Sequence, residues 1–313
     1  MGSHGGVAPL MDRVTLVVPC YRDAATISRA LESVYRQTRP VDEVIVVNDC
    51  SPETDEIERV LKRFPDVRCL RHAVNLGLAA TRNTGMTAAT GNVVTFLDAD
   101  DELHPQKIEL QLQLMGENTA ITCRVQRIRQ NERAGEYPVY CGFGLVETSA
   151  SVGRLLLTNY LTGASLMIPK ELLMKVGGYD PSLRSCEDYD LWLRLIENGV
   201  TVRNLPLPLY YYHFNERSLS NDMANISYWE LEVIKRYYAR SQRGFLKSFQ
   251  DRCIWAWWIL KHLARLETAP NETLKRRTLN NIDLLAGHPL FLWGLRAVGK
   301  FHVLRPYVLM KSR

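Results

Sequence analysis

Short apolar runs alternate with helical segments in the first third of the chain, and this alternation limits the possible folds more than any other feature. Strands are expected at 14–19, 44–47, 67–70 and 93–97. Helices are expected at 27–37, at 53–64 and in the second half of 75–91. Strands that alternate with helices of this length predict right-handed βαβ units and a parallel sheet.

The later part of the chain predicts further strands and two helices. The strands are expected at 120–129, 162–169, 200–205 and 207–213. A short helix is expected at 170–176, and Leu191, Leu195 and Ile196 recur at helical spacing in a second helix. An acidic cluster that contains Glu187 and Asp188 then falls on the first turn of that second helix.

Two common phosphate-binding signatures are missing from the sequence. The turn after the first strand has no GxGxxG, and no GxxxxGK[ST] occurs anywhere in the chain. The sequence therefore argues against dinucleotide binding and P-loop chemistry. Phosphates would have to be held by a metal ion or by basic side chains instead.

The strand expected at 93–97 ends in a group of carboxylates, Asp98, Asp100 and Asp101. Open α/β sheets bind ligands at the carboxyl ends of their strands, and side chains two apart in an extended segment point the same way. Asp98 and Asp100 can therefore face one ligand, and two close carboxylates favour Mg²⁺ or Mn²⁺ shared with phosphates. The alternative is that Asp100, Asp101 and Glu102 cap the helix expected near Pro105.

Cysteine usage and the amino terminus suggest the compartment. The seven cysteines of the 313-residue chain form no CxxC pair, which argues against a zinc ribbon or a disulfide framework and for a reducing compartment. The start of the chain has no signal-peptide pattern. We expect residues 1–11 to be disordered and the protein to be cytoplasmic.

The carboxyl-terminal part of the chain differs in charge from the rest. From residue 236 onward there are 15 Lys and Arg against four Asp and Glu, a balance of +11 in a chain of net charge +5. We therefore expect a main domain at 12–235 and a basic, Trp-rich helical region at 236–313. Apolar, Trp-containing stretches within 245–310 suit a helix lying on an anionic membrane, peripheral to the inner face of the plasma membrane. The alternative is that these tryptophans pack on the main domain, and nucleic-acid binding is not expected because no recognised motif supports it.

Six separated motifs occur in one order along about two thirds of the chain. They are Val17-Val18-Pro19-Cys20-Tyr21, Val46-Val47-Asn48-Asp49-Cys50-Ser51, Asn75-Leu76-Gly77 through Ala80-Thr81-Arg82-Asn83-Thr84-Gly85, Leu97-Asp98-Ala99-Asp100-Asp101, Gly177-Gly178-Tyr179-Asp180 and Glu187-Asp188-Tyr189-Asp190-Leu191. This order resembles the family 2 glycosyltransferases, which have the GT-A fold.

The resemblance implies an α/β fold of the GT-A type. Its mostly parallel sheet would be sandwiched by helices, with a Rossmann-like nucleotide-binding half, an acceptor half and a helical carboxyl-terminal extension. The implied reaction is metal-dependent, inverting transfer of a sugar from a nucleotide-sugar donor to an acceptor hydroxyl. A UDP-sugar is the preferred expectation, with dTDP- and GDP-sugars as alternatives, and the acceptor would be a cell-surface polysaccharide or a lipid-linked glycan.

The resemblance also implies roles for individual residues. The donor would contact Pro19, Tyr21, Asp49, Asn75, Gly77, Arg82 and Asp98. Asp100 would hold the metal, with Asp98 bridging to the metal or to the donor ribose. Asp188 is the expected general base, and its neighbour Glu187 would orient the acceptor. Helix capping is the alternative for this acidic pair.

His213 has two possible roles. It follows an aromatic strand and precedes a Ser-rich turn, where relatives carry a histidine that can contact the metal or the diphosphate. The alternative is a structural hydrogen bond. One departure from the family pattern is Arg22, where many relatives have Asn.

Two other classes of function are alternatives to transfer. A non-catalytic sugar-nucleotide or glycan-binding module would not need the intact set of Asp98, Asp100 and Asp188. A nucleotidyltransferase would need a Gly-rich, basic turn after the first strand, which is absent. Transfer is therefore the predicted function.

Overall fold

The structure is a computed structural model that describes residues 12–128, 137–140, 148–214 and 223–241, with the single positions 258, 272, 273, 276 and 280. By its contacts the chain divides into two compact units. Unit 1 comprises Met1–Ser149, Leu161–Gly178 and Asn198–His213. Unit 2 comprises Ala150–Tyr160, Tyr179–Glu197 and Phe214–Arg313.

Unit 1 is built on one mixed sheet, whose strands within the described residues follow the order β3-β2-β1-β4-β8-β6-β9-β5, with β7 beside β9. The strands are β1 (Val14–Cys20), β2 (Glu43–Asn48), β3 (Val67–Arg71), β4 (Val93–Phe96), β5 (Glu102–Leu103), β6 (Thr119–Ile128), β7 (Thr148–Ser149), β8 (Met167–Pro169) and β9 (Thr201–His213). The pairings from β3 through β2 and β1 to β4 are all parallel, whereas β8 runs antiparallel to both β4 and β6. The predicted α/β fold class is confirmed.

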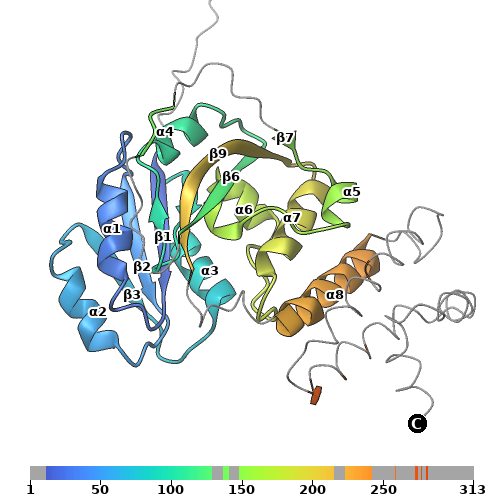
Figure 1. The fold of residues 1–313 in the computed structure, drawn as a ribbon, viewed down its shortest axis with the longest axis horizontal. Coiled ribbons are helices and arrows are strands. Elements are labelled where there is room, and N and C mark those ends of the chain that lie inside the picture. The colour runs from blue at the N-terminus through green and yellow to red at the C-terminus, as the bar shows by residue number, and fades with distance from the viewer. Residues whose placement is uncertain are drawn as a thin grey trace, which may run out of the picture. The chain divides into compact units, whose positions relative to one another are not determined.

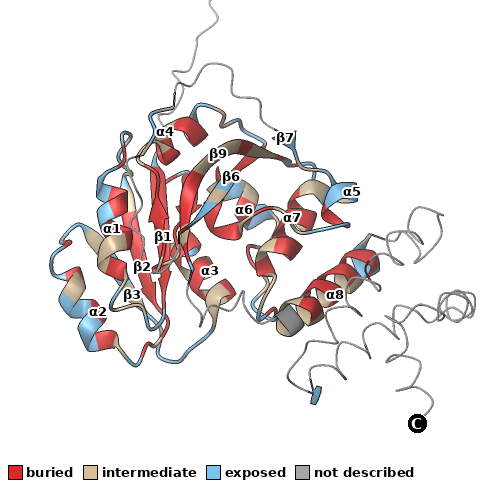
Figure 2. Ribbon diagram, in the orientation of Figure 1, coloured by how far each residue is buried: buried red, intermediate tan, exposed pale blue. Residues whose placement is uncertain are grey.

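Helices cover both faces of the parallel half of this sheet (Figure 1). Leu16 and Val18 of β1 share a core cluster with apolar residues of α1 (Ile27–Tyr35) and α2 (Thr54–Leu61). Val17, which points to the opposite face, contacts α3 (Leu78–Ala88). Because both faces are covered, β1 is buried along its whole length (Figure 2).

The contact between α3 and the sheet is unusually close. A β-carbon built on Gly85 of α3 would lie 2.2 Å from Cγ1 of Val17. Only glycine therefore allows the backbone of α3 to approach β1 this closely. This approach fixes the position of α3, which carries the predicted donor residue Arg82.

The remaining helices of unit 1 are α4 (Lys107–Leu112), the single 3₁₀ turn η1 (Gly163–Ser165) and α6 (Lys170–Lys175). The sequence predicts a strand over 162–169, but only Met167–Pro169 is extended. The first part forms a turn because the backbone N–H and the hydroxyl of Ser165 both donate to the Thr162 carbonyl, at 3.1 and 2.7 Å.

The two strands predicted at 200–205 and 207–213 are one strand, β9. Its register against β6 shifts near Pro206 and Pro208, where Leu205 pairs with Cys123 and Pro208 pairs with Arg124. Proline has no N–H to donate to the ladder, so the pairing is interrupted there without ending the strand.

Within the described residues, unit 2 contains three helices, α5 (Val152–Leu155), α7 (Glu187–Glu197) and α8 (Met223–Arg240). The hydroxyl of Tyr189 on α7 donates to the carbonyl of Leu155 at 2.7 Å. Arg240 of α8 donates to Asp190 of α7 at 2.9 Å. The predicted domain boundary between 235 and 236 falls inside α8.

Several predictions concern residues outside the described part of the chain. These are the disorder of 1–11 and nearly all of the basic region 245–310, including its predicted membrane contact. Among the described helices, none combines the length and apolar character needed to cross a bilayer.

Candidate functional site

The carboxyl ends of β1, β2 and β4 carry most of the predicted donor residues of unit 1. Pro19 lies in β1 and is buried, and Tyr21 follows the strand with 40% of its surface exposed. Asp49 follows β2, and Asp98 follows β4 by two residues. Because β1 pairs in parallel with both β2 and β4, these strand ends meet at one edge of the sheet.

Asp49 organises the predicted donor loop. Its buried carboxylate accepts hydrogen bonds from the backbone N–H groups of Leu76 and Gly77, each at 2.8 Å. The side chain of Asn75 donates to the Asp49 carbonyl at 3.2 Å. Gly77 adopts φ +88°, a conformation that favours glycine. The structure thus brings Asp49, Asn75 and Gly77 together, with the Asp49 carboxylate holding the loop.

A histidine that the sequence analysis did not identify completes this arrangement. Nδ1 of His72 lies 2.6 Å from Oδ1 of Asp49, and Nε2 lies 2.9 Å from the hydroxyl of Thr84. His72 therefore links the end of β2 to α3. Its position one residue beyond β3 was the only available signal, and a single histidine beside a short strand carries little information by itself.

The predicted residues Arg82 and Asp98 are in direct contact. Arg82 is only 3% exposed, and its Nη2 donates to Oδ1 of Asp98 at 2.8 Å. A buried guanidinium held on a helix next to a carboxylate is a strong donor for anionic groups. This pair can therefore present both a positive and a negative group at the end of β4.

Asp98 to Asp101 form a tight turn, which the N–H of Asp101 closes by donating to the carbonyl of Asp98 at 3.1 Å. The carboxylate of Asp101 is 1% exposed and accepts from the hydroxyl of Tyr210 at 2.7 Å and from the N–H of His213 at 2.8 Å. Arg29 of α1 donates to the carbonyl of Asp100. The turn is therefore fixed to both β9 and α1.

The helix-capping alternative for Asp101 and Glu102 is wrong. The helix that follows, α4, begins at Lys107, and its N-cap Gln106 makes no side-chain cap bond. The two carboxylates instead contact residues far from α4: Asp101 accepts hydrogen bonds from Tyr210 and His213 of β9, and Glu102 contacts His213 and Arg36.

Glu102 forms a buried pair with His213. Nε2 of His213 lies 2.7 Å from Oε1 of Glu102, and Arg36 donates to Oε2 at 3.1 Å. Burial alone would raise the pKa of Glu102, but the hydrogen bond and charge of His213, with the charges of Arg29 and Arg36, lower it overall. These contacts favour the structural role of His213, and its predicted ligation of a metal stays a prediction.

Glu187 and Asp188 are the first two residues of α7 in unit 2. Glu187 is 8% exposed. Oδ1 of Asp188 accepts from the N–H of Tyr189 at 2.7 Å and from Nδ2 of Asn159 at 3.4 Å. The residue before them, Cys186, adopts φ +59°, a strained conformation for a non-glycine residue that often accompanies functional sites. Asn159 was not among the residues predicted from the sequence.

Residues 15–176 match the family model described as "Glycosyl transferase family 2". The chain belongs to this family. It is 33% identical over 232 residues to an uncharacterized glycosyltransferase of Haemophilus influenzae, which covers 73% of the chain and 78% of the relative. It is 31% identical over 202 residues to the pre-mycofactocin glycosyltransferase of Mycobacterium tuberculosis, covering 63% of the chain and 42% of the relative. The predicted enzyme class, a glycosyltransferase, is confirmed.

Two solved structures share the fold of this family 2 glycosyltransferase. TarS of S. aureus, in complex with UDP-GlcNAc, aligns with a TM-score of 0.55 and 17% identity, covering 87% of the chain and 90% of TarS. The mannosyltransferase PcManGT of Pyrobaculum calidifontis, in complex with GDP-Man and Mn²⁺, aligns with a TM-score of 0.59 and 19% identity, covering 97% and 85%.

The charges of the turn fit a divalent cation. Burial and the negative charge of Asp98 raise the pKa of Asp100 to about 6, so the ionised turn gains from a positive charge beside it. No group of three His, Cys, Asp or Glu side chains within the described residues converges on a metal-sized site. Mg²⁺ typically takes only one or two carboxylates and completes its shell with substrate phosphates and water. Asp98 and Asp100 fit that mode of binding.

Proposed function

We propose that this family 2 glycosyltransferase transfers a sugar from a nucleotide-sugar donor to an acceptor hydroxyl with inversion at the anomeric carbon. One observation carries the proposal. The turn that contains Asp98 and Asp100 lies at the same sheet edge as the loop held by Asp49. A diphosphate needs charge neutralisation and its nucleoside needs a shaped wall, and this edge offers groups for both.

The donor site is proposed on unit 1. Pro19 and the partly exposed Tyr21 would line the nucleoside pocket, together with the loop that Asn75 and Gly77 shape. Arg82 would reach the diphosphate from α3. TarS has been solved with UDP and with UDP-GlcNAc, and PcManGT with GDP-Man. These complexes support a nucleotide sugar as the donor here, with a UDP-sugar preferred.

Asp98 and Asp100 would hold Mg²⁺ or Mn²⁺. The bound cation would act as a Lewis acid that neutralises the charge developing on the leaving diphosphate. Arg82, 2.8 Å from Asp98, keeps that carboxylate oriented and adds a positive charge of its own. The PcManGT complex contains Mn²⁺, which supports this choice of metal.

Asp188 would act as general base on the acceptor. Its carboxylate takes the proton of the acceptor hydroxyl while the oxygen forms a bond to the anomeric carbon and the bond to the diphosphate oxygen breaks. The side chain of Asn159 donates to Oδ1 of Asp188 at 3.4 Å, and this contact would stabilise the ionised, proton-accepting form. Glu187 would orient the acceptor.

The acceptor is proposed to be a cell-surface polysaccharide or a lipid-linked glycan. This step rests on the resemblance to the family and on the basic, Trp-containing stretch at 245–310, which suits contact with an anionic membrane.

The decisive experiment measures release of nucleoside diphosphate from UDP-N-acetylglucosamine, UDP-glucose, dTDP-glucose and GDP-mannose with Mn²⁺. Wild-type protein is compared with Asp100→Ala, Asp188→Asn and the control Asp66→Asn, whose carboxylate is exposed. We expect EDTA and Asp100→Ala to abolish release. Asp188→Asn should lower turnover by about 10²–10⁴-fold and leave binding of UDP unchanged.

Three results would count against the proposal. Full turnover in EDTA or in Asp100→Ala would exclude the proposed role of a metal ion. Full turnover in Asp188→Asn would exclude Asp188 as the general base. Binding of a nucleotide sugar with no turnover in any donor and acceptor combination would favour a non-catalytic binding module.

A further inference from the structure

The hydroxyl of Tyr210 joins the two ends of the turn that carries Asp98 and Asp100. It accepts a hydrogen bond from the N–H of Asp98 at 3.2 Å and donates to Oδ2 of Asp101 at 2.7 Å. A tyrosine hydroxyl has a single proton to donate, and that proton and an acceptor position are both used here. One oxygen atom thus contacts the first and the last residue of the turn.

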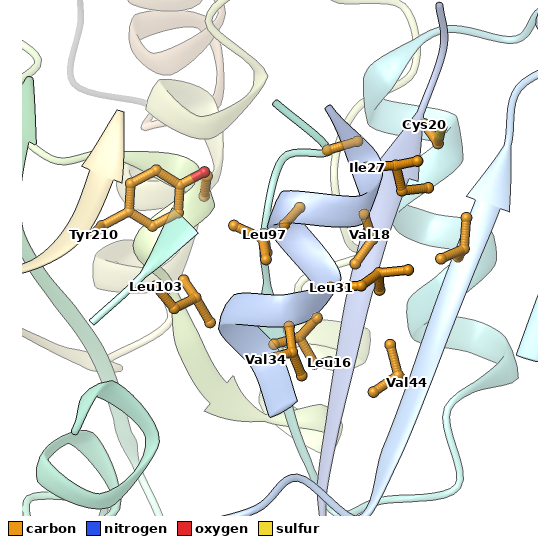
Figure 3. Close-up of a cluster of buried hydrophobic side chains, with 14 of the residues drawn as sticks. Leu16, Val18, Cys20, Ile27, Leu31, Val34, Val44, Leu97, Leu103 and Tyr210 are labelled. Atoms are coloured by element: carbon orange, nitrogen blue, oxygen red, sulfur yellow. The ribbon is translucent and has the colours of Figure 1, made fainter. Parts of the chain in front are cut away.

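The ring of Tyr210 is packed in the core, which positions this hydroxyl. Tyr210 is fully buried in the core cluster that includes Leu97 and Leu103, which flank the turn in sequence (Figure 3). Tyr210 lies on β9, and β9 pairs with β5, the strand that follows the turn, so that Leu103 lies opposite Tyr210. The hydroxyl is therefore positioned by packed apolar side chains and by the sheet.

The other oxygen of Asp101 is also occupied. Oδ1 accepts from the backbone N–H of His213 at 2.8 Å, so the Asp101 carboxylate has a donor on each oxygen. Asp101 is 1% exposed, whereas the side chain of Asp98 is 32% exposed. Within one turn, the last carboxylate faces the interior and the first remains accessible. The bond from Tyr210 to Asp101 fixes this division.

We propose that Tyr210 is a positioning residue for the metal-binding turn, and that Asp101 serves as its anchor rather than as a metal ligand. The proposal rests on the proposed function, because it assumes that Asp98 and Asp100 bind the cation. By bridging both ends of the turn, Tyr210 holds the backbone on which these two carboxylates are presented. Residues that orient metal ligands typically change metal affinity by about 10–100-fold when they are removed.

Tyr210→Phe is the direct test, because it removes only the bridging oxygen and keeps the ring in its core position. Tyr211→Phe on the same strand is the matched control. Tyr211 is 3% exposed and, within the part of the chain that the structure describes, its hydroxyl makes no hydrogen bond. Binding of Mn²⁺ in the presence of UDP is measured by loss of the free Mn²⁺ signal in electron paramagnetic resonance, with circular dichroism as the check of folding.

We expect Tyr210→Phe to bind Mn²⁺ about tenfold or more weakly than wild type while remaining folded, and Tyr211→Phe to bind like wild type. Unchanged binding in Tyr210→Phe, within about twofold, would overturn the inference when Asp100→Ala loses binding in the same titration. If wild type takes up no Mn²⁺, or if Asp100→Ala binds as well as wild type, the proposed metal site fails and the inference fails with it. The Asp100→Ala titration thus separates the two failures.

A second variant covers the case in which Tyr210→Phe does not fold. Asp101→Asn keeps the size of the side chain but places an amide NH₂ against one of its two present donors, Tyr210 or His213. It should also weaken Mn²⁺ binding, whereas Asp66→Asn, whose carboxylate is exposed, should leave it unchanged. Wild-type Mn²⁺ binding in folded Asp101→Asn would overturn the anchoring role.

Discussion

Asp100 should make the metal-free protein less stable than an uncharged variant, and Asp100→Asn tests this. Burial and the nearby charge of Asp98 raise the pKa of Asp100 from 3.8 to about 6. Each pKa unit corresponds to about 1.4 kcal/mol, so ionised Asp100 lowers the free energy of unfolding by at most about 3 kcal/mol. Partial exposure of the side chain reduces this upper limit.

The sign of the pH dependence follows from the direction of the shift. Below the unfolded-state pKa of Asp100, both states are protonated and the charge costs nothing. Above the unfolded-state pKa, the unfolded state loses its proton before the folded state does. Wild type therefore becomes less stable than Asp100→Asn as the pH rises through the folded-state pKa of about 6. We therefore expect the variant to be more stable at pH 7.5 and the two proteins to converge near pH 4.

Thermal unfolding in EDTA at pH 7.5 and at pH 4 measures this difference. For a cooperative unit of this size, about 3 kcal/mol corresponds to an increase in Tm on the order of 5–8 °C. The control Asp66→Asn should leave Tm unchanged, because Asp66 is exposed. A variant no more stable than wild type at pH 7.5, or equally stabilised at both pH values, would refute the reasoning. Adding Mn²⁺ with UDP should raise the Tm of wild type more than that of the variant, because the variant lacks one of the two charges proposed to bind the cation.

Three further variants test the donor loop, the packing of α3 and the base. His72→Ala removes a partner of the Asp49 carboxylate. The variant should bind UDP about tenfold more weakly than wild type, as measured by calorimetry. Wild-type affinity would mean that the two backbone N–H bonds to Asp49 are sufficient to hold the loop. Gly85→Ala should lower the free energy of unfolding, measured in urea, by about 1–3 kcal/mol, because the new Cβ would lie 2.2 Å from Cγ1 of Val17. An unchanged urea midpoint would contradict the close approach of α3 to β1. Asn159→Ala, measured against the exposed neighbour Thr158→Ala, should lower turnover because Asp188 loses a donor. Equal turnover in both variants would separate Asn159 from catalysis.

Much of the fold was predictable because its signals are local. The first four strands and three helices of unit 1 lie where apolar runs and helical spacing predict them, within a few residues. The main errors arose at prolines and in a turn. The strands predicted at 200–205 and 207–213 form the single strand β9, because a bulge preserves pairing around Pro206 and Pro208, which have no N–H. The hydroxyl of Ser165 favoured a turn where a strand was expected.

The sequence alone determined which residue types end the parallel strands, and hence that Asp49, Asp98 and Asp100 gather at one edge. That inference needs only the period of a strand and the direction of a parallel sheet. Which of these carboxylates remains available depends on contacts between distant parts of the chain. Asp49 is bound by two backbone N–H groups and His72, and Asp101 by Tyr210 and His213. Neighbouring carboxylates look alike in a sequence, and they differ in the structure because donors far along the chain reach one of them and not the next.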